Sequence, residues 1–385
     1  MPMGSENRLT TSLLHTARKL AIGLSIAALL LGGLEGVLRV SGFKYRAPRP
    51  FILSNVTDRQ LQRLEEMYRY HPYWFWEPRP GARIADFWEL MRAAKSIQCG
   101  TERINAAGYR GPERPRLSGS GTLRIAVLGD SSTFGVGVCW DETYAAVLER
   151  ELPNAEVLNF GVVGFSAFQG EKLLEGRVLT YRPRVVLVAF GAANEIAAAG
   201  SHDVDAKFHI TSQASPRAVL WHDRLSGLRV FQLVERAFSR KAEGWIELKA
   251  RDNMDKWTRG SDDYVRNQSL ASFERSLERM VKLGRAHDAR VILIVPPRRR
   301  AVETRWPWAN EYTKYATAIK RVASRLNVPY WDARAAFRAV PHSDERLFLD
   351  DYHPNVAGHQ IYAKFLAEKL LHEMEYESKK GSHRP

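Results

Sequence analysis

Residues 125–138 read IAVLGDSSTFGVGV, and this stretch is the most informative part of the sequence about the fold. An apolar run ends at Gly129 and Asp130, and small hydroxyl side chains and further glycines follow. A buried strand that turns directly into a helix produces this pattern. Ser131 then lies at the carboxyl end of a strand, with its backbone amide at a helix N-terminus. The turn is either an ordinary capped strand end or a place where a serine is held to react.

The chain on both sides of this turn alternates short apolar runs with helical stretches. We expect strands at 123–128, 156–159, 185–190 and 290–295, and helices at 142–152, 167–179, 269–286 and 309–326. Apolar runs without strict alternation indicate strands that are buried on both faces. The pattern therefore predicts an α/β fold with a doubly wound parallel sheet.

Two segments depart from this alternation. Residues 196–265 are polar and mixed, with helical character around 218–238, and we expect an insertion over the carboxyl edge of the sheet. Such an insertion is either a lid or a surface elaboration. Residues 373–385 end in SKKGSHRP and are expected to form a disordered tail.

An apolar segment precedes the fold. Residues 20–38 read LAIGLSIAALLLGGLEGVL, in which only Glu35 is charged. As a helix this run nearly spans a hydrocarbon core of roughly 30 Å. A cleaved signal peptide needs small residues after the run, and LEGVLR at 34–39 fits that poorly. We therefore expect a tail over 1–19 and an uncleaved transmembrane anchor over 20–40. The large domain is expected outside the cytoplasm.

Residues 41–121 connect the anchor to the main domain and are rich in aromatic side chains. These aromatics either pack the arm onto the main domain, which we expect, or form a sugar-stacking platform. They are Tyr68, Tyr70, Tyr73, Trp74, Phe75, Trp76 and Trp88.

Composition limits the partners of the chain. The 385 residues carry a net charge of +14, which favours anionic surroundings such as lipid headgroups or acidic glycans. The basic residues are dispersed and no nucleic-acid-binding motif is present, so we expect no nucleic-acid partner. Arg298, Arg299 and Arg300 are interpreted as a solvated charge run, with contact to an anionic substrate as the alternative.

The two cysteines, Cys99 and Cys139, form no CxxC pair, so a cysteine-based metal site is not expected. They pair in an exported domain or stay unrelated thiols in a cytosolic one.

Three further stretches carry candidate chemistry at expected strand ends. Residues 159–164 read NFGVVG, whose glycines allow close backbone approach but do not have the G-x-G-x-x-G spacing of a nucleotide loop. Residues 191–195 read GAANE, and Asn194 can donate to an oxyanion or cap a helix. Residues 350–358 read DDYHPNVAG, in which Asp350 is close enough to orient His353.

A serine needs such a base, because its hydroxyl is a poor nucleophile by itself. We call residues 129–133 the serine turn. Its fifth position is Thr133, so the turn is not the G-x-S-x-G elbow of α/β-hydrolases. The histidines that lack a comparable local setting are interpreted as surface or structural; they are His71, His202 and His359.

The four stretches, in this order, resemble the SGNH or GDSL hydrolase superfamily over roughly residues 122–370. The resemblance implies a flavodoxin-like sheet and a serine hydrolase domain over 122–372, with no metal or organic cofactor. It implies that Ser131 is the nucleophile, His353 the base and Asp350 its orienting carboxylate. The Ser131 amide, the Gly164 amide and the Asn194 side chain are the implied oxyanion hole.

The match is incomplete at three positions. Ser132 stands where the family name has leucine, and Ala192 and Glu195 replace the Gly and Asp of the usual third block. The stretch NAAGYRG at 105–111 is also similar to an Asn-x-x-Gly-aromatic-Arg-Gly motif in a membrane-anchored bacterial branch of the superfamily. That resemblance implies a single-pass inner-membrane protein with its hydrolase domain in the periplasm.

The expected function is therefore a membrane-anchored esterase acting on an acylated glycan, a lipid or a small ester. One alternative is an O-acyltransferase that uses the same residues on an envelope polysaccharide. The other is a non-catalytic envelope scaffold, which would predict decay of the Ser, His and Asp residues.

Overall fold

The computed structural model describes residues 6–44, 66–71, 74–84, 99–100, 102–196, 221, 224–225, 227–239, 269–299 and 309–381. Tyr73, Trp88, His202 and most of the expected insertion at 196–265 lie outside these residues. The chain divides into two compact units. One consists of Met1–Arg49 and Arg217–Trp245, and the other of Pro50–Pro216 and Ile246–Pro385.

The larger unit contains a five-stranded parallel sheet in the order β4-β3-β5-β6-β7. Its strands are β3 (Leu123–Gly129), β4 (Ala155–Gly161), β5 (Val185–Ala189), β6 (Arg290–Val295) and β7 (Tyr330–Asp332). Numbered along the chain, this is the 2-1-3-4-5 order of flavodoxin-like doubly wound folds. The predicted fold class is confirmed, and β7 is the one strand of this sheet that the apolar pattern did not indicate.

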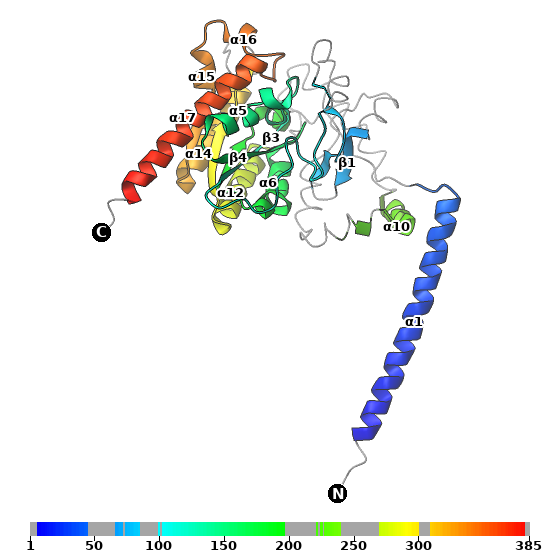
Figure 1. The fold of residues 1–385 in the computed structure, drawn as a ribbon. Coiled ribbons are helices and arrows are strands. Elements are labelled where there is room, and N and C mark those ends of the chain that lie inside the picture. Colours follow the sequence, from blue (N-terminus) through cyan, green and yellow to red (C-terminus); the bar gives the residue numbers. More distant parts are fainter. Residues whose placement is uncertain are drawn as a thin grey trace. The chain divides into compact units, whose positions relative to one another are not determined.

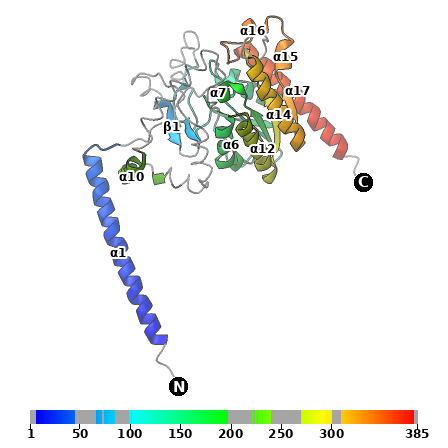
Figure 2. The same ribbon diagram turned by 180° about the vertical axis from the view of Figure 1, so that it is seen from behind.

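Helices cover both faces of the sheet (Figures 1 and 2). On one face lie α5 (Tyr144–Glu151), α15 (Arg334–Arg338) and α17 (Val356–Gly381), packed around a single buried cluster. On the other lie α6 (Ala167–Gly176), α12 (Leu270–Ala286) and α14 (Ala309–Leu326). The chain also forms short helices: α4 (Ser131–Phe134), α7 (Ala192–Ile196), α16 (Ser343–Arg346), and the 3-10 turns Trp140–Glu142 and Val178–Tyr181.

The strands are buried because both of their faces carry apolar side chains. Ile125 and Val127 of β3 point into the cluster with α5 and α17, and the intervening Ala126 and Leu128 are equally buried. Every residue of β5 is buried. Each large apolar side chain removed from water contributes roughly 1.5–3 kcal/mol, which makes this central sheet the most stable part of the fold.

The helices begin and end close to the predicted boundaries. Thr143 caps α5 by accepting from the Ala146 amide, and Ser269 caps α12 in the same way. The helix α17 continues to Gly381, into the segment that was expected to be a disordered tail. The sequence of that segment contains good helix formers and no proline before Pro385, so the helix extends from its packed first half.

The connecting arm contains a hairpin of β1 (Tyr68–His71) and β2 (Phe75–Pro78). Trp74 and Trp76 are buried. The Trp74 ring lies under the Arg177 guanidinium, and Trp76 Nε1 donates to the Val163 carbonyl at 3.0 Å. These two residues pack the arm, as expected, and are not available for sugar stacking.

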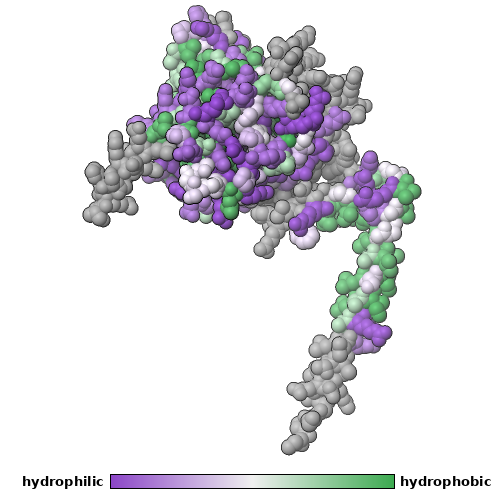
Figure 3. Space-filling view, in the orientation of Figure 1, coloured by the Kyte–Doolittle hydropathy of each residue, from purple (hydrophilic) through white to green (hydrophobic). Residues whose placement is uncertain are grey.

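The smaller unit contains the long helix α1 (Glu6–Val40) and α10 (Arg229–Ser239). Within α1, His15–Val40 is long and apolar enough to cross a membrane, with mean hydropathy 2.0 and none of it buried. Figure 3 shows hydrophobic side chains along the exposed surface of this helix. By sequence position α10 belongs to the expected insertion.

Candidate active site

The candidate site residues follow the carboxyl ends of neighbouring strands. Ser131 opens α4 directly after β3, Gly164 lies in the turn after β4, and Asn194 lies in α7 after β5. The strand order reverses between β3 and β5, and a crevice at the carboxyl ends of the strands forms at such a point. Three sequence segments therefore converge on the edge of the sheet where doubly wound folds bind ligands.

The turn that carries Ser131 is closely packed. Asp130 caps α4, and its Oδ1 accepts from the Ser132 amide at 3.0 Å. A Cβ on Gly129 would lie 2.1 Å from Thr133 Oγ1, and one on Gly161 would lie 2.2 Å from the Phe134 nitrogen. Only glycine fits at these two positions, because the turn is pressed against the strands on both sides.

Asp350 and His353 lie together on one short loop. Asp350 Oδ1 accepts from the amides of Tyr352 and His353, at 2.7 and 2.8 Å. Asp350 Oδ2 is 2.7 Å from His353 Nδ1. On the other side of the ring, His353 Nε2 is 2.8 Å from Ser131 Oγ. The structure therefore brings the three residues predicted for catalysis into one hydrogen-bonded series.

The protonation pattern of this series follows from the carboxylate. An ionised carboxylate only accepts hydrogen bonds, so the Nδ1 of neutral His353 carries the proton and Nε2 is the acceptor for the Ser131 hydroxyl. Burial alone raises the pKa of Asp350, but the hydrogen bond and charge of His353 and the two backbone amides outweigh it. The net pKa of Asp350 is lowered, so the carboxyl is ionised at neutral pH.

Asn194 and Gly164 lie in the loops that flank Ser131. Asn194 Nδ2 donates to the Phe165 carbonyl at 3.0 Å and to Asp130 Oδ2 at 3.4 Å. Gly164 has φ +79°, a left-handed conformation that glycine adopts without strain. Trp76 from the arm holds the same loop through the adjacent Val163 carbonyl.

Arg298 corrects one prediction. It was interpreted as part of a solvated charge run, but it is 1% exposed. Its Nη2 forms an ion pair with Asp130, and its Nη1 donates to Ser132 Oγ and, at 3.0 Å, to the Tyr352 carbonyl. Arg298 follows β6 by a short turn, so it reaches the same edge of the sheet as the other site residues. That position after a strand, rather than its charge, was the available signal.

Arg298 therefore links the serine turn to the loop that carries Asp350 and His353, which we call the histidine loop. Burial by itself lowers the pKa of its guanidinium, but the charge of Asp130 raises it above the usual value, so Arg298 stays protonated. Ser132 Oγ also donates to the Tyr352 carbonyl at 3.0 Å. A fixed positive charge and a hydroxyl thus connect segments that are far apart in the sequence.

Glu195 is a second buried acid at this edge. It is 1% exposed, and its Oε1 accepts from the Ala167 amide at 2.9 Å. Burial, and then the negative charge of Asp130, raise the pKa of Glu195 well above its usual value. The environment of Glu195 therefore favours its protonated form, unlike that of Asp350.

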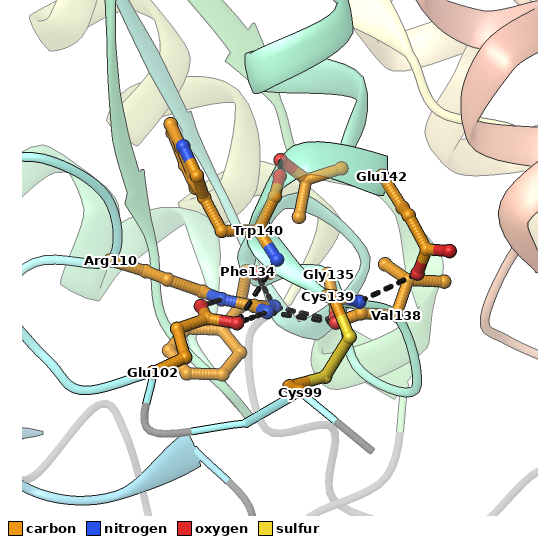
Figure 4. The surroundings of a disulfide bond; sticks show 10 residues. Cys99, Glu102, Arg110, Phe134, Gly135, Val138, Cys139, Trp140 and Glu142 are labelled. Carbon is orange, nitrogen blue, oxygen red and sulfur yellow. Dashed lines mark hydrogen bonds and ion pairs between the residues drawn. A yellow bond between two sulfur atoms is a disulfide. The ribbon is translucent and has the colours of Figure 1, made fainter. Parts of the chain in front are cut away.

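Arg110, from the connecting arm, holds the other end of the serine turn. Its Nη1 donates to the carbonyls of Phe134 and Gly135, at 2.9 and 2.7 Å, and its Nη2 donates to the Val138 carbonyl at 2.8 Å. The opposite side of the guanidinium pairs with Glu102. Figure 4 shows Arg110 lying between the Glu102 carboxylate and these carbonyls.

A disulfide joins Cys99 to Cys139 beside this arginine (Figure 4). The bond connects the arm to the loop that follows the serine turn, next to Glu102, whose Oε2 accepts from the Trp140 amide at 3.0 Å. Of the two possibilities that the sequence left open for the cysteines, the structure contains the paired one. A stable disulfide is typical of an oxidising compartment.

Two other histidines within the described residues, His71 and His359, are structural. His359 is fully buried and its Nδ1 accepts from the Tyr144 amide at 3.1 Å. Burial lowers the pKa of His359 to about 3, so its ring is neutral. His71 is buried and its ring stacks on Trp74. Within the described ranges, no group of three or more His, Cys, Asp or Glu side chains is arranged to hold a metal ion.

Part of the chain is similar to a known protein family. Residues 258–361 match the model of the GDSL-like lipase/acylhydrolase family. The match includes Asp350 and His353 but does not extend to Ser131. It supports an ester hydrolase. No curated protein matches the chain.

Several solved structures are similar to part of this chain at low identity. A lipase/acylhydrolase from Enterococcus faecalis is 20% identical, with a TM-score of 0.40, over 64% of this chain and 94% of its own. An acetyl xylan esterase, AlAXEase, is 17% identical, with a TM-score of 0.42, over 64% of this chain and 98% of its own. The psychrotrophic esterase EstA from Pseudoalteromonas sp. is 13% identical, with a TM-score of 0.40, over 66% of this chain and 99% of its own.

Proposed function

We propose that this chain is a membrane-anchored serine esterase of the SGNH type, which hydrolyses an acyl ester through Ser131, His353 and Asp350. The observation that carries the proposal is the pair of hydrogen bonds on the two sides of one imidazole. Nε2 lies 2.8 Å from the serine hydroxyl and Nδ1 lies 2.7 Å from a carboxylate. A base oriented in this way activates a serine that is unreactive alone.

The reaction proceeds by acyl transfer. His353 Nε2 takes the Ser131 proton as Oγ attacks the ester carbonyl carbon, and the imidazolium formed is stabilised by Asp350. Collapse of the tetrahedral intermediate breaks the bond to the alcohol, which leaves with the proton from His353. Water, deprotonated by His353, then attacks the acyl-serine, releases the acid and restores the serine hydroxyl.

Donors near Ser131 stabilise the oxyanion that forms in each step. The Ser131 amide opens α4, where the helix N-terminus favours negative charge, and the Gly164 amide and the Asn194 amide complete the proposed hole. The hydrogen bond from Asn194 Nδ2 to Asp130 is long, at 3.4 Å. A developing oxyanion is the stronger acceptor and replaces that bond.

The anchor and its location are part of the proposal. The exposed apolar surface of α1 supports a single-pass helix over residues 20–40 in a bacterial inner membrane. The Cys99–Cys139 disulfide supports a hydrolase domain in the oxidising periplasm. The net charge of +14 supports a substrate in anionic surroundings, which we propose is an acylated glycan, a lipid or a small ester.

A covalent probe tests the nucleophile. The full chain in detergent is treated with a fluorophosphonate, and the labelled peptide is identified by mass spectrometry. In parallel, p-nitrophenyl esters of increasing acyl length are hydrolysed by the wild type and by Ser131→Ala. We expect label on Ser131 and a loss of kcat on the order of 10⁵-fold in the variant.

Ser132→Ala is the matched control, because the neighbouring hydroxyl is also buried but binds the Tyr352 carbonyl. It should retain label on Ser131. A wild type that takes no label and hydrolyses no ester would refute the proposal. Label without hydrolysis, combined with acetyl transfer to a polysaccharide, would identify the acyltransferase instead.

A further inference from the structure

The end of α1 and the start of α10 are joined by polar contacts around one carboxylate. Glu35 Oε2 accepts from the Val230 amide at 2.9 Å, in the first turn of α10. Glu35 Oε1 accepts from Arg39 Nε at 2.8 Å, and Arg39 Nη2 donates to the Gly227 carbonyl at 3.3 Å. The N-terminus of α10 is therefore attached to the last turns of α1, within the same compact unit.

These contacts matter because Glu35 is the one charged residue in the apolar run 20–38. A carboxylate near the hydrocarbon of a membrane is costly unless it is paired. Here an arginine and a helix N-terminus both compensate its charge. If α1 crosses a membrane, as the proposed function states, α10 has to stay at the depth where Glu35 emerges.

Part of the apolar side of α10 is exposed, unlike that of a helix in a soluble protein. Leu233 and Val234 are 36% and 49% exposed, and Leu228 just before the helix is 41% exposed. Gln232, on the polar side, is only 9% exposed and accepts from Arg229 Nη1. A soluble amphipathic helix buries its apolar side and exposes its polar side. In α10 the apolar side chains face outward.

We propose that α10 lies in the plane of the membrane surface, with its apolar side in the lipid, beside the point where α1 leaves the bilayer. The exposed apolar side chains of α1, such as Val37 and Val40, continue this surface at the junction. Arg39, Arg229 and Arg236 place positive charge around the same junction, where anionic headgroups lie. An amphipathic helix with apolar residues on one side and arginines on the other binds this interface.

This inference rests on α1 being a membrane anchor, as proposed above. It adds that the insertion supplies a second membrane contact. The chain is then bound to the membrane at two points instead of through α1 alone. Lipid, rather than a second protein, is the occupant that matches the continuity with α1 and the charge around the junction.

The test measures the depth of single labelled positions in the full chain. Val234→Cys and Arg236→Cys, which lie on opposite sides of the helix, are labelled with an environment-sensitive fluorophore, without reductant so that the native disulfide stays closed. The proteins are reconstituted in vesicles of phosphatidylethanolamine and phosphatidylglycerol. Brominated lipid and aqueous iodide serve as quenchers. We expect brominated lipid to quench the label at 234 severalfold more than the label at 236, with iodide showing the reverse order.

Three other outcomes overturn the inference. Equal iodide access at both positions shows that α10 lies in water. Protection from iodide without quenching by brominated lipid shows that protein covers the apolar side. Release of the full chain from the vesicles by alkaline carbonate refutes the anchor, and with it this inference. Ester hydrolysis in detergent, measured on the same samples, separates all of these from failure of the proposed chemistry.

Discussion

The serine turn and the histidine loop are built in different ways, although their side chains meet. The serine turn is held by residues far away in the sequence: Arg298 on Asp130, and Arg110 on the carbonyls that follow. The histidine loop is held in addition by a local carboxylate, because Asp350 binds the amides of Tyr352 and His353. Arg298 and Ser132 bind the carbonyl of Tyr352 in the same loop. Ser131 is 8% exposed, whereas the Asp350 side chain is 50% exposed.

The difference indicates that one region positions the nucleophile Ser131 and the other makes it reactive. The buried turn fixes where the nucleophile is, at a large cost if one of its charged partners is lost. The local loop sets the protonation of the imidazole and contributes little to the stability of the fold. Variants in the two regions should therefore separate the loss of activity from the loss of stability.

The largest expected effect on activity comes from the histidine loop. Asp350→Asn should lower kcat on the order of 10⁴-fold, because an asparagine amide can donate to Nδ1 and move the ring proton to Nε2, where it blocks the serine. The melting temperature should change by less than about 2 °C, since the site is local and half exposed. Steady-state kinetics and thermal unfolding check the two parts. A large loss of stability would contradict the comparison.

The next effect comes from the serine turn, where we expect a larger loss of stability and a smaller loss of activity than in the histidine loop. Arg298→Met leaves Asp130 buried without its ion pair, so we expect a loss of about 3–5 kcal/mol in the free energy of unfolding. The displaced turn should lower kcat by about tenfold to a hundredfold. Urea unfolding and kinetics on the same preparation measure both. Arg299→Met, at the half-buried neighbouring residue, is the control and should be close to wild type.

The disulfide gives a smaller effect on activity. Replacing both Cys99 and Cys139 by alanine frees a segment with a sequence separation of 40, for which chain entropy alone predicts a loss of up to about 4 kcal/mol. Arg110 and Glu102 stay in place, so kcat at 25 °C should fall by no more than about fivefold. Adding reductant to the wild type should reproduce the variant. An abolished activity at full folding would show that the bond itself positions the serine.

The smallest effect concerns Glu195, whose buried site favours the protonated form. Its pKa is raised in the folded state, so above the unfolded pKa of about 4.3 the folded protein binds more protons than the unfolded one, and stability falls as pH rises. Glu195→Gln keeps an acceptor for the Ala167 amide and removes that dependence. We expect the variant to melt higher than wild type at pH 8, with a smaller difference at pH 5. Identical pH profiles would contradict a protonated Glu195.

The features that depend on local sequence are the ones that could be predicted. Asp350 and His353 stand three residues apart, and the run around Ser131 has the form of a strand end, so both were visible as patterns. The strands were visible because their apolar runs are continuous. The buried roles of Arg110 and Arg298 were not predicted. Arg298 was interpreted as part of a solvated charge run, and the contacts that bury both arginines come from segments far away in the sequence. The three-residue β7 was too short to show a period.

The contacts of Arg110 show that the connecting arm and the hydrolase domain are not independent modules. The alternating pattern of the hydrolase domain begins near residue 122, and a boundary there would separate a tether from an enzyme. Arg110 lies before that boundary, yet it is 0% exposed and satisfies three carbonyls around the end of the serine turn. The arm is therefore not an interchangeable spacer. Grafting the hydrolase domain of this chain onto another anchor would transfer function only if the graft carried the arm with it.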